Sequence, residues 1–214
     1  MGYQTVVFDM DGTILETLAD IHHSVNVTMD AMGYPHRSFE EVRGFVGNGA
    51  ARLIRCCVPE GCNEEDCQQA LNYYKAYYGK HAQDATAPYP GIPELLKTLK
   101  GRGIQLAVVS NKPDDSVKEL CEAYFPGVFP VAIGDHPDRR KKPAPDSVFA
   151  ALEILGVPAE GAVYVGDSEV DLTTAKNAGL PCIAVTWGFR DEAELRKQGA
   201  VTLAHTPEEL LNML

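Results

Sequence analysis

The sequence predicts an α/β protein, a doubly wound parallel sheet that is interrupted after its first strand by an all-helical insert. Three observations support this fold class. Short apolar runs recur along the chain, helical patterns lie between the later runs, and one long segment near the start holds helical patterns without strands. Strands that alternate with helices favour a parallel sheet with helices on both faces. The 214 residues suffice for such a core and a sizeable insert.

The expected strands are short apolar runs, many of whose residues are β-branched, as is typical of strands buried on both faces. They cover residues 5–8, 104–109, 131–133, 162–165 and 182–185. Helical faces separate the later strands, and the last helix has its own start signal. Thr206 and Glu209 form a capping box around Pro207, which takes the first helical position.

Residues 15–86 break this alternation, because they contain consecutive helical patterns and no strand. The segment 87–91 is then rich in proline and glycine and resembles a linker that re-enters the sheet. The sequence therefore predicts a core domain of residues 1–14 and 87–214, and a helical domain of residues 15–86. We expect the insert above the carboxyl ends of the strands, where doubly wound folds bind their ligands. The helices of the insert are expected over residues 18–32, 39–45, 50–57 and 64–81.

The composition limits the partners. A formal net charge of -11 argues against binding to nucleic acid or to an anionic membrane surface, and no apolar run approaches the length of a membrane span. None of the six cysteines forms a CxxC pair, so we expect reduced thiols in a cytoplasmic protein rather than a disulfide or zinc framework. Monomer and homodimer both remain open.

The strongest chemical signal is the segment that runs from Phe8 to Thr13. An apolar strand ends in Asp9 and Asp11, two carboxylates separated by one residue, and Gly12 follows. Two carboxylates so close repel each other, and one should titrate high unless a cation lies between them. Such a pair suits a nucleophile and a proton donor. The structural alternative is an ordinary strand-end turn, where Asp and Gly are common.

Three further segments place polar groups after apolar strands. Ser110 and Asn111 can donate hydrogen bonds to a phosphate oxygen, although such residues often cap a helix. Lys142 precedes a helix start stiffened by proline, and its alternative is a solvated surface charge. Asp167 and Asp171 follow the strand at 162–165, and they would share one helical face if the helix began at once. Asp171 could also be a first-turn acid favoured by the helix dipole.

Parallel strands deliver all these residues to one edge of the sheet. The carboxylates of Asp9, Asp11 and Asp167 are hard oxygen ligands and suit Mg²⁺, which binds through a few carboxylates and substrate phosphate. Lys142 would offset the remaining negative charge. The sequence therefore predicts a magnesium site beside a phosphate site.

These four segments resemble, in order and spacing, the four motifs of the haloacid dehalogenase superfamily. The resemblance spans nearly the whole chain and implies a Rossmann-like core with an inserted helical cap. It implies that Asp9 is a nucleophile that forms an aspartyl-phosphate and that Asp11 is the general acid and base. It further implies that Mg²⁺ is held by the Asp9 carboxylate, the Asp11 main-chain carbonyl and Asp167. Asp171 would anchor waters of the metal or Lys142.

The same resemblance implies a site for the phosphoryl oxygens. Ser110 and Lys142 would bind them, with Thr13 and Asn111 in the same site. Phosphoryl transfer then depends mostly on positioning and charge stabilisation. The implied substrate is a small phosphorylated metabolite, because a closed cap would exclude large molecules and water.

A glycine-rich segment around Arg43 bears on the substrate. It could present backbone N–H groups and a guanidinium to an anion, or it could be a flexible turn with a surface arginine. It resembles the corresponding loop of phosphoglycolate phosphatases, which makes 2-phosphoglycolate the expected substrate. Related pyrophosphatases and sugar-phosphate phosphatases or mutases share much of the pattern. The mutases carry a histidine where this chain has Ile21, and they tend to carry valine in place of Thr13, so both residues favour hydrolysis.

Two hypotheses from other classes remain. A phosphoacceptor signalling module also combines an acidic Mg²⁺ site, an aspartate acceptor and a lysine on a doubly wound fold. The helical insert and the position of Asp9 on the first strand argue against it. A noncatalytic scaffold is the third hypothesis, and the presence of every catalytic group argues against that one.

Overall fold

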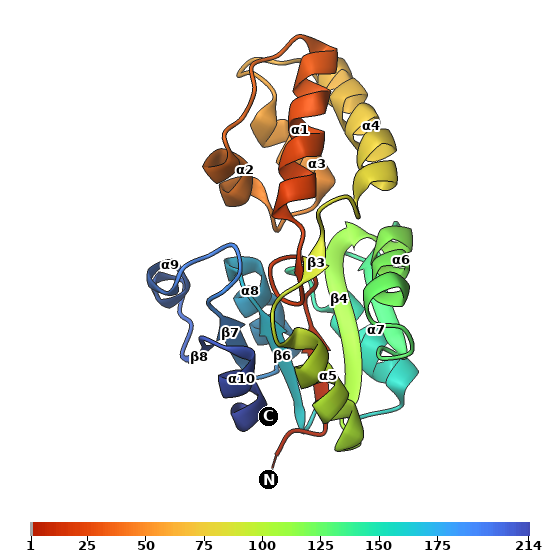
Figure 1. Ribbon diagram of the computed structural model, residues 1–214, viewed down its shortest axis with the longest axis vertical. Helices are drawn as coiled ribbons and strands as arrows, with labels where there is room; N and C mark the ends of the chain where they lie inside the picture. Colours follow the sequence, from red (N-terminus) through yellow and green to blue (C-terminus); the bar gives the residue numbers. More distant parts are fainter. Residues whose placement is uncertain (1) are drawn as a thin grey trace. The chain divides into compact units, whose positions relative to one another are not determined.

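The computed structural model describes residues 2–214. The chain divides into two compact units, one made of Met1–Leu15 and Pro88–Leu214 and the other of Glu16–Ala87. We call them the sheet unit and the helical unit (Figure 1). The chain crosses between the units through β2 (Leu15–Glu16) and β3 (Ala87–Pro88), which pair with each other as a two-stranded sheet.

In the described part of the sheet unit, six parallel strands form one sheet in the order β5-β4-β1-β6-β7-β8. The fold class predicted from the sequence, a doubly wound parallel sheet, is therefore confirmed. The first strand lies in the middle, and the chain moves outward from it on both sides. The bounds are β1 Thr5–Phe8, β4 Gln105–Pro113, β5 Val131–Asp135, β6 Ala162–Gly166, β7 Cys182–Val185 and β8 Thr202–Ala204.

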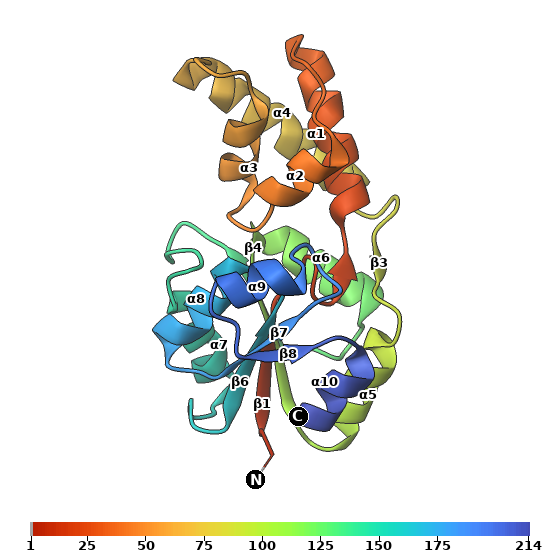
Figure 2. The same cartoon turned by 90° about the vertical axis from the view of Figure 1, so that its left-hand side faces the viewer.

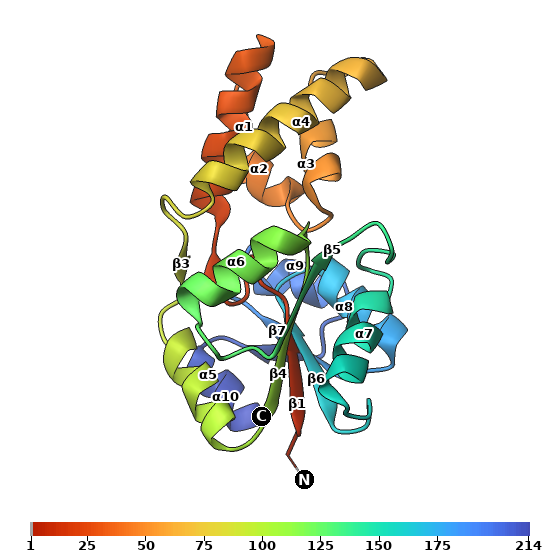
Figure 3. The same ribbon diagram turned by 90° about the vertical axis from the view of Figure 1, so that its right-hand side faces the viewer.

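Helices cover both faces of this sheet. Figures 2 and 3 show α5 and α10 on one side and α7 and α8 on the other. The side chains of β1 alternate between these two layers, since Val6 and Phe8 belong to one apolar cluster and Val7 to the other. The helices are α5 Ile92–Gly101, α6 Asp114–Tyr124, α7 Asp146–Leu155, α8 Glu169–Ala178, α9 Glu192–Lys197 and α10 Pro207–Met213.

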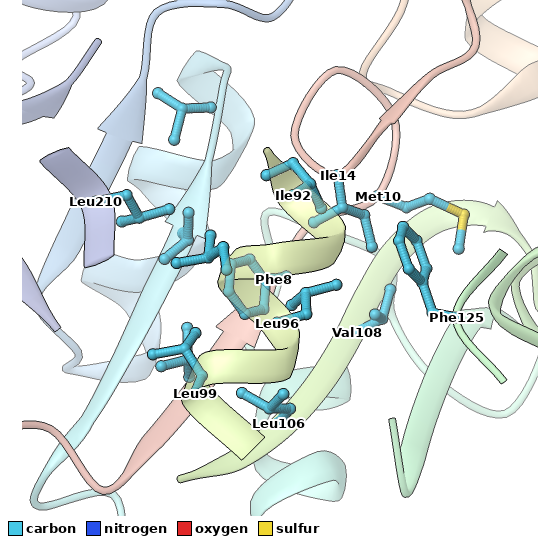
Figure 4. Close-up of a cluster of buried hydrophobic side chains, with 14 of the residues drawn as sticks. Phe8, Met10, Ile14, Ile92, Leu96, Leu99, Leu106, Val108, Phe125 and Leu210 are labelled. Carbon is cyan, nitrogen blue, oxygen red and sulfur yellow. The ribbon is translucent and has the colours of Figure 1, made fainter. Parts of the chain in front are cut away.

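The larger apolar cluster lies between the sheet and the helices α5, α6 and α10. Figure 4 shows its centre, where Phe8 and Val108 from neighbouring strands meet Leu96 of α5. Met10 and Ile14, which flank the loop after β1, are fully buried in the same cluster. The core thus anchors both ends of the segment that carries Asp11, Gly12 and Thr13.

The helical unit contains the expected helices at the expected residues. They are α1 Leu18–Met32, α2 Phe39–Phe45, α3 Ala50–Cys57 and α4 Glu64–His81. The first ends at Gly33, whose φ of 68° is left-handed, and the second begins with a capping box between Ser38 and Glu41. The helix α1 packs against α4. Within residues 2–214, no helix is both long and apolar enough to span a bilayer.

The structure differs from the prediction in three places. Residues 15 and 16, expected within the strand-free insert, form the short strand β2. The strand expected to end at Val109 continues to Pro113, and the register between β4 and β5 shifts along this extension. Its residues Ser110, Asn111 and Lys112 are polar, so the apolar pattern ended before the strand did. The edge strand β8 was not predicted, because three residues are too few to show a period.

One buried carboxylate joins the two ends of the helical unit. Asp20, on α1, is only 4% exposed. It accepts hydrogen bonds from Ala85 N, at 2.9 Å, and from Thr86 N and Thr86 Oγ1, at 2.8 Å each. Asp20 therefore holds the segment in which the chain leaves the unit against the helix in which it enters.

We predict that Asp20→Ala destabilises the protein by about 3 kcal/mol, because the buried N–H and hydroxyl of Thr86, together with the N–H of Ala85, lose a charged acceptor. Urea unfolding followed by far-UV circular dichroism measures this loss. The control is Asp30→Ala on the same helix, which removes an exposed pair with His36 and should cost less than about 0.5 kcal/mol. Equal effects of the two substitutions would contradict the account.

Candidate active site

The three central strands bring polar residues to one edge of the sheet. Asp9 directly follows β1, and its N–H donates to Val165 O of β6 at 2.8 Å. Asp167 directly follows β6, while Ser110 and Asn111 lie within β4 on the other side of β1. These four side chains are buried. The expected convergence therefore occurs between the neighbouring strands β4, β1 and β6.

A buried ammonium lies at the centre of this group. Lys142 is 4% exposed, and its Nζ lies 2.8 Å from Asp9 Oδ1 and 2.8 Å from Asp171 Oδ1. Its third contact is a hydrogen bond of 3.0 Å to Tyr164 Oη. Asn111 Nδ2 donates to Lys142 O at 3.1 Å, which fixes the backbone of the lysine. Lys142 is therefore buried within the site and paired with two of its aspartates, and the alternative of a solvated surface charge is wrong.

Asp171 is held by several donors besides Lys142. It is the third residue of α8, and its Oδ2 accepts from Ser168 N at 3.1 Å and from Ser168 Oγ at 2.6 Å. The helix begins only at Glu169, so Asp167 precedes it. The condition under which Asp167 and Asp171 would share a helical face is therefore not met, and Asp171 is the first-turn acid that the sequence left open as the alternative. Asp171 instead reaches back over the start of the helix and meets Lys142.

Asp167 sits in a tight pocket of backbone. Its Oδ1 accepts from Thr13 Oγ1 at 3.2 Å, and its Oδ2 accepts from Phe189 N at 2.7 Å. A Cβ at Gly12 would overlap the Asp167 carboxylate, and a Cβ at Gly188 would overlap both Asp167 and the Gly12 carbonyl. Glycine is required at both positions because the Asp167 carboxylate lies so close to the backbone. Gly12 also has a φ of 84°, a left-handed conformation that favours glycine. The carboxylate is therefore held in one position.

The carboxylates of Asp9, Asp167 and Asp171 form a buried acidic triad with ligand oxygens within 4.8 Å of one another. Burial, and next the charge of Asp171, raises the pKa of Asp9 from its ordinary value of 3.8 to about 7, although Lys142 opposes this shift. Burial and the charges of Asp171 and Asp9 hold the pKa of Asp167 well above its usual range. The triad has more negative charge than Lys142 balances, and it offers the oxygen ligands that a divalent cation prefers.

Asp11 has a cationic neighbour that the sequence reasoning missed. Lys112 Nζ lies 3.0 Å from Asp11 Oδ1, and the side chain of Lys112 is only 4% exposed. Tyr164, which bonds to both Lys142 and Asp171, was also missed. A lysine directly after Ser110 and Asn111 was a usable signal. Nothing in the apolar run around Tyr164 marked its hydroxyl as part of the site.

Arg43 belongs to the helical unit. It lies in the last turn of α2, where it forms an ion pair with Glu40 at 3.6 Å. Its expected role in substrate binding stays a prediction. The residues that the structure brings together are all in the sheet unit: Asp9, Asp11, Thr13, Ser110, Asn111, Lys142, Asp167 and Asp171.

Comparison with known families identifies the class of protein. Residues 6–185 match the family of haloacid dehalogenase-like hydrolases. The match covers most of the chain, which therefore belongs to this family and is an enzyme of the hydrolase class.

Named relatives narrow the class. The phosphoglycolate phosphatase of Pseudomonas savastanoi pv. phaseolicola is 36% identical over 86% of this chain and 70% of its own length. The phosphoglycolate phosphatase of Aquifex aeolicus is 31% identical over 87% of this chain and 86% of its own length. The protein is thus similar in sequence to phosphatases of this kind.

Solved structures agree in fold. A protein from Lactobacillus delbrueckii subsp. bulgaricus, provisionally assigned as a phosphoglycolate phosphatase, is 38% identical with a TM-score of 0.95 over 100% of this chain and 99% of its own. CbbY from Rhodobacter sphaeroides, solved in complex with phosphate, is 30% identical with a TM-score of 0.77. That comparison covers 97% of this chain and 96% of CbbY.

The pKa of Asp9 predicts how stability changes with pH in a buffer that contains a chelator. The folded protein binds the Asp9 proton more tightly than the unfolded chain, so this group favours folding at low pH. Its contribution declines as pH rises from about 4 to about 7. Asp9→Asn cannot ionise. We therefore expect the stability of Asp9→Asn relative to wild type to rise over this range, by at most about 4 kcal/mol.

Urea unfolding at a series of pH values measures this difference. The substitution also weakens the contact with Lys142. Burial disfavours the charged form of Lys142, but the charges of Asp171 and Asp9 hold its pKa well above its usual range, so the lysine stays charged between pH 4 and 8. The change with pH is therefore the readout. A constant offset between the two proteins at every pH would show that Asp9 titrates normally.

Proposed function

We propose that the protein is a Mg²⁺-dependent phosphatase that hydrolyses a small phosphomonoester, 2-phosphoglycolate, through an aspartyl-phosphate on Asp9. The observation that carries this proposal is the Lys142 ammonium, buried between Asp9 and Asp171 beside the Asp167 carboxylate. Such a site has a nucleophile, a fixed cation and spare carboxylate ligands at one sheet edge. These are the groups that phosphoryl transfer requires.

The donor set suits Mg²⁺. The Asp9 carboxylate, the Asp11 main-chain carbonyl and the Asp167 carboxylate would hold the ion. When bound, the ion would neutralise charge on the phosphoryl oxygens and on the acidic triad. We assign Asp171 to holding Lys142 in place and not to binding the metal, because Lys142, Tyr164 and Ser168 already donate hydrogen bonds to both of its oxygens.

The covalent chemistry uses two aspartates. An oxygen of Asp9 attacks phosphorus, so a new O–P bond forms while the ester O–P bond breaks. Asp11 gives its proton to the departing alkoxide, which leaves as an alcohol. Asp11 then takes a proton from water as that water attacks phosphorus. Inorganic phosphate leaves, and the Asp9 carboxylate is restored.

Polar groups on β4 and beside it position the phosphoryl group. Ser110 and Lys142 bind its oxygens in this proposal. Thr13 donates its hydroxyl to Asp167, and the Asn111 amide donates to the Lys142 carbonyl. We therefore assign these two side chains to holding Asp167 and Lys142 in place. Their contribution to substrate binding is indirect.

The choice of 2-phosphoglycolate rests on several relatives that carry the name phosphoglycolate phosphatase at 31–36% identity. The helical unit would act as a cap, and Arg43 would bind the carboxylate of the substrate. Pyrophosphate and sugar phosphates are the competing substrates, and Ile21 argues against a mutase. Membership of a hydrolase family argues against a phosphoacceptor module. We place the enzyme in the cytoplasm, where its six free cysteines would stay reduced.

Steady-state assays test the proposal. Wild type should release phosphate from 2-phosphoglycolate only with Mg²⁺, and faster than from pyrophosphate or hexose phosphates. Asp9→Asn should lower kcat by at least about 10³-fold, because the nucleophile is removed. The matched control is Asp30→Asn, an exposed acid that should leave kcat unchanged. Full Mg²⁺-dependent turnover by Asp9→Asn would contradict the mechanism. Faster phosphate release from another ester would contradict the assignment of 2-phosphoglycolate as the substrate.

Substitution of Arg43 tests the role of the helical unit. If its guanidinium binds the substrate carboxylate, Arg43→Ala should raise KM for 2-phosphoglycolate by about tenfold to a hundredfold. It should change KM for phenyl phosphate, which lacks a carboxylate, less than about threefold. Arg55→Ala, which removes an exposed arginine paired with Glu64 in the same unit, serves as the control. Equal changes for both esters would assign Arg43 to structure only.

A further inference from the structure

Lys112 is a second buried lysine of the site, and the mechanism above does not use it. Its Nζ lies 3.0 Å from Asp11 Oδ1, and the two side chains are 4% and 15% exposed. By contrast, Lys118 pairs with Asp114 while its own side chain is 59% exposed. Burial of an ammonium is costly unless it is paired, so the place of Lys112 calls for a function.

The backbone fixes Lys112 firmly. Its N–H donates to Ser110 Oγ at 3.2 Å, within the stretch of β4 where the register to β5 shifts. On β5, a Cβ at Gly134 would overlap Lys112 O and the backbone of Asp114, and Gly134 N donates to Asp114 Oδ1 at 2.8 Å. The two strands therefore approach closely at this point. Irregular pairing of this kind re-aims side chains beside active sites.

Asp11 lies outside the named strands and helices. It lies in the loop after β1, where its backbone bridges to Leu15 and the next N–H, of Gly12, donates to Leu15 O at 2.9 Å. Its side chain is the most exposed of the acids in the site. A carboxylate on a loop can rotate about χ1 and χ2, and a fixed ammonium at 3.0 Å selects one orientation.

The two lysines have separate tasks. Lys142 contacts Asp9 and Asp171, the nucleophile and the anchor. Lys112 contacts Asp11, the general acid and base of the proposed mechanism. We propose that Lys112 is a positioning residue, which holds Asp11 Oδ1 so that the other oxygen of Asp11 faces the leaving group of the substrate. This inference rests on the proposed function.

A change of leaving group tests this role. Phenyl phosphate and 4-nitrophenyl phosphate share one ring, but 4-nitrophenolate is a far weaker base and needs no proton to depart. Neither ester has a carboxylate. The parameter is kcat/KM, which covers only binding and transfer of the phosphoryl group to Asp9. A positioned general acid contributes about 10²–10⁴-fold to a step that needs it.

Lys112→Met should therefore lower kcat/KM by about 30-fold for phenyl phosphate and by about threefold for 4-nitrophenyl phosphate. The ratio of kcat/KM for 4-nitrophenyl phosphate to kcat/KM for phenyl phosphate should then rise by about tenfold. Lys112→Arg, which keeps a cation, should restore the ratio. The control Lys118→Met, an exposed lysine paired with an aspartate, should leave it unchanged. In Asp11→Asn, where no acid remains, adding Lys112→Met should not change the ratio further.

The outcomes separate this inference from the proposed function. No phosphate release by wild type from any ester would overturn both. Normal wild-type activity with equal losses for the two aryl esters in Lys112→Met would overturn the inference alone. Loss confined to 2-phosphoglycolate would assign Lys112 to the carboxylate of the substrate and would also overturn it. Should Lys112→Met fail to fold by circular dichroism, Lys112→Gln is read in the same way.

Discussion

The site depends on one ammonium group held in the interior between two aspartates. Lys142 contacts Asp9, Asp171 and the Tyr164 hydroxyl within 3.0 Å. Removal of this ammonium would leave the acidic triad without a buried positive charge beside it and would lower the free energy of unfolding by several kcal/mol. These contacts also set the geometry, because Asp9 directly follows β1, Asp171 lies on α8 and Tyr164 lies on β6. One charge thereby ties the central strands to the helix beyond them.

Close backbone packing makes this concentration of carboxylates possible. A side chain at Gly12 or Gly188 would overlap Asp167, and one at Gly166 would overlap Asp171. Each glycine therefore leaves the space that a carboxylate fills. The acids are held by N–H and hydroxyl donors from Phe189, Ser168 and Thr13. Such fixed donors and acids form a site that needs little rearrangement when charge moves during phosphoryl transfer.

Much of this could be predicted from the sequence. Buried parallel strands are short apolar runs, and the first helix of the helical unit has an apolar stripe that ends at Gly33, so both patterns can be read from the sequence. The acids after β1 and β6 were recognisable because they end apolar runs. Lys112 was marked only by its place directly after Ser110 and Asn111. Nothing marked Tyr164, since its role comes from its contacts with Lys142 and Asp171. Asp171 was recognisable as a first-turn acid and as an anchor for Lys142, but its pairing with Ser168 depends on where the helix begins.

The haloacid dehalogenase-like fold supplies the sheet edge, and the particular chemistry comes from the residues placed there. A crystal structure grown with Mg²⁺ and beryllofluoride, an analogue of the aspartyl-phosphate, tests this account most directly. We predict a beryllofluoride group bonded to Asp9, with Lys142 and Ser110 on its fluorines and Mg²⁺ between Asp9 and Asp167. An adduct on another residue, or an ion bound away from Asp167, would contradict the account.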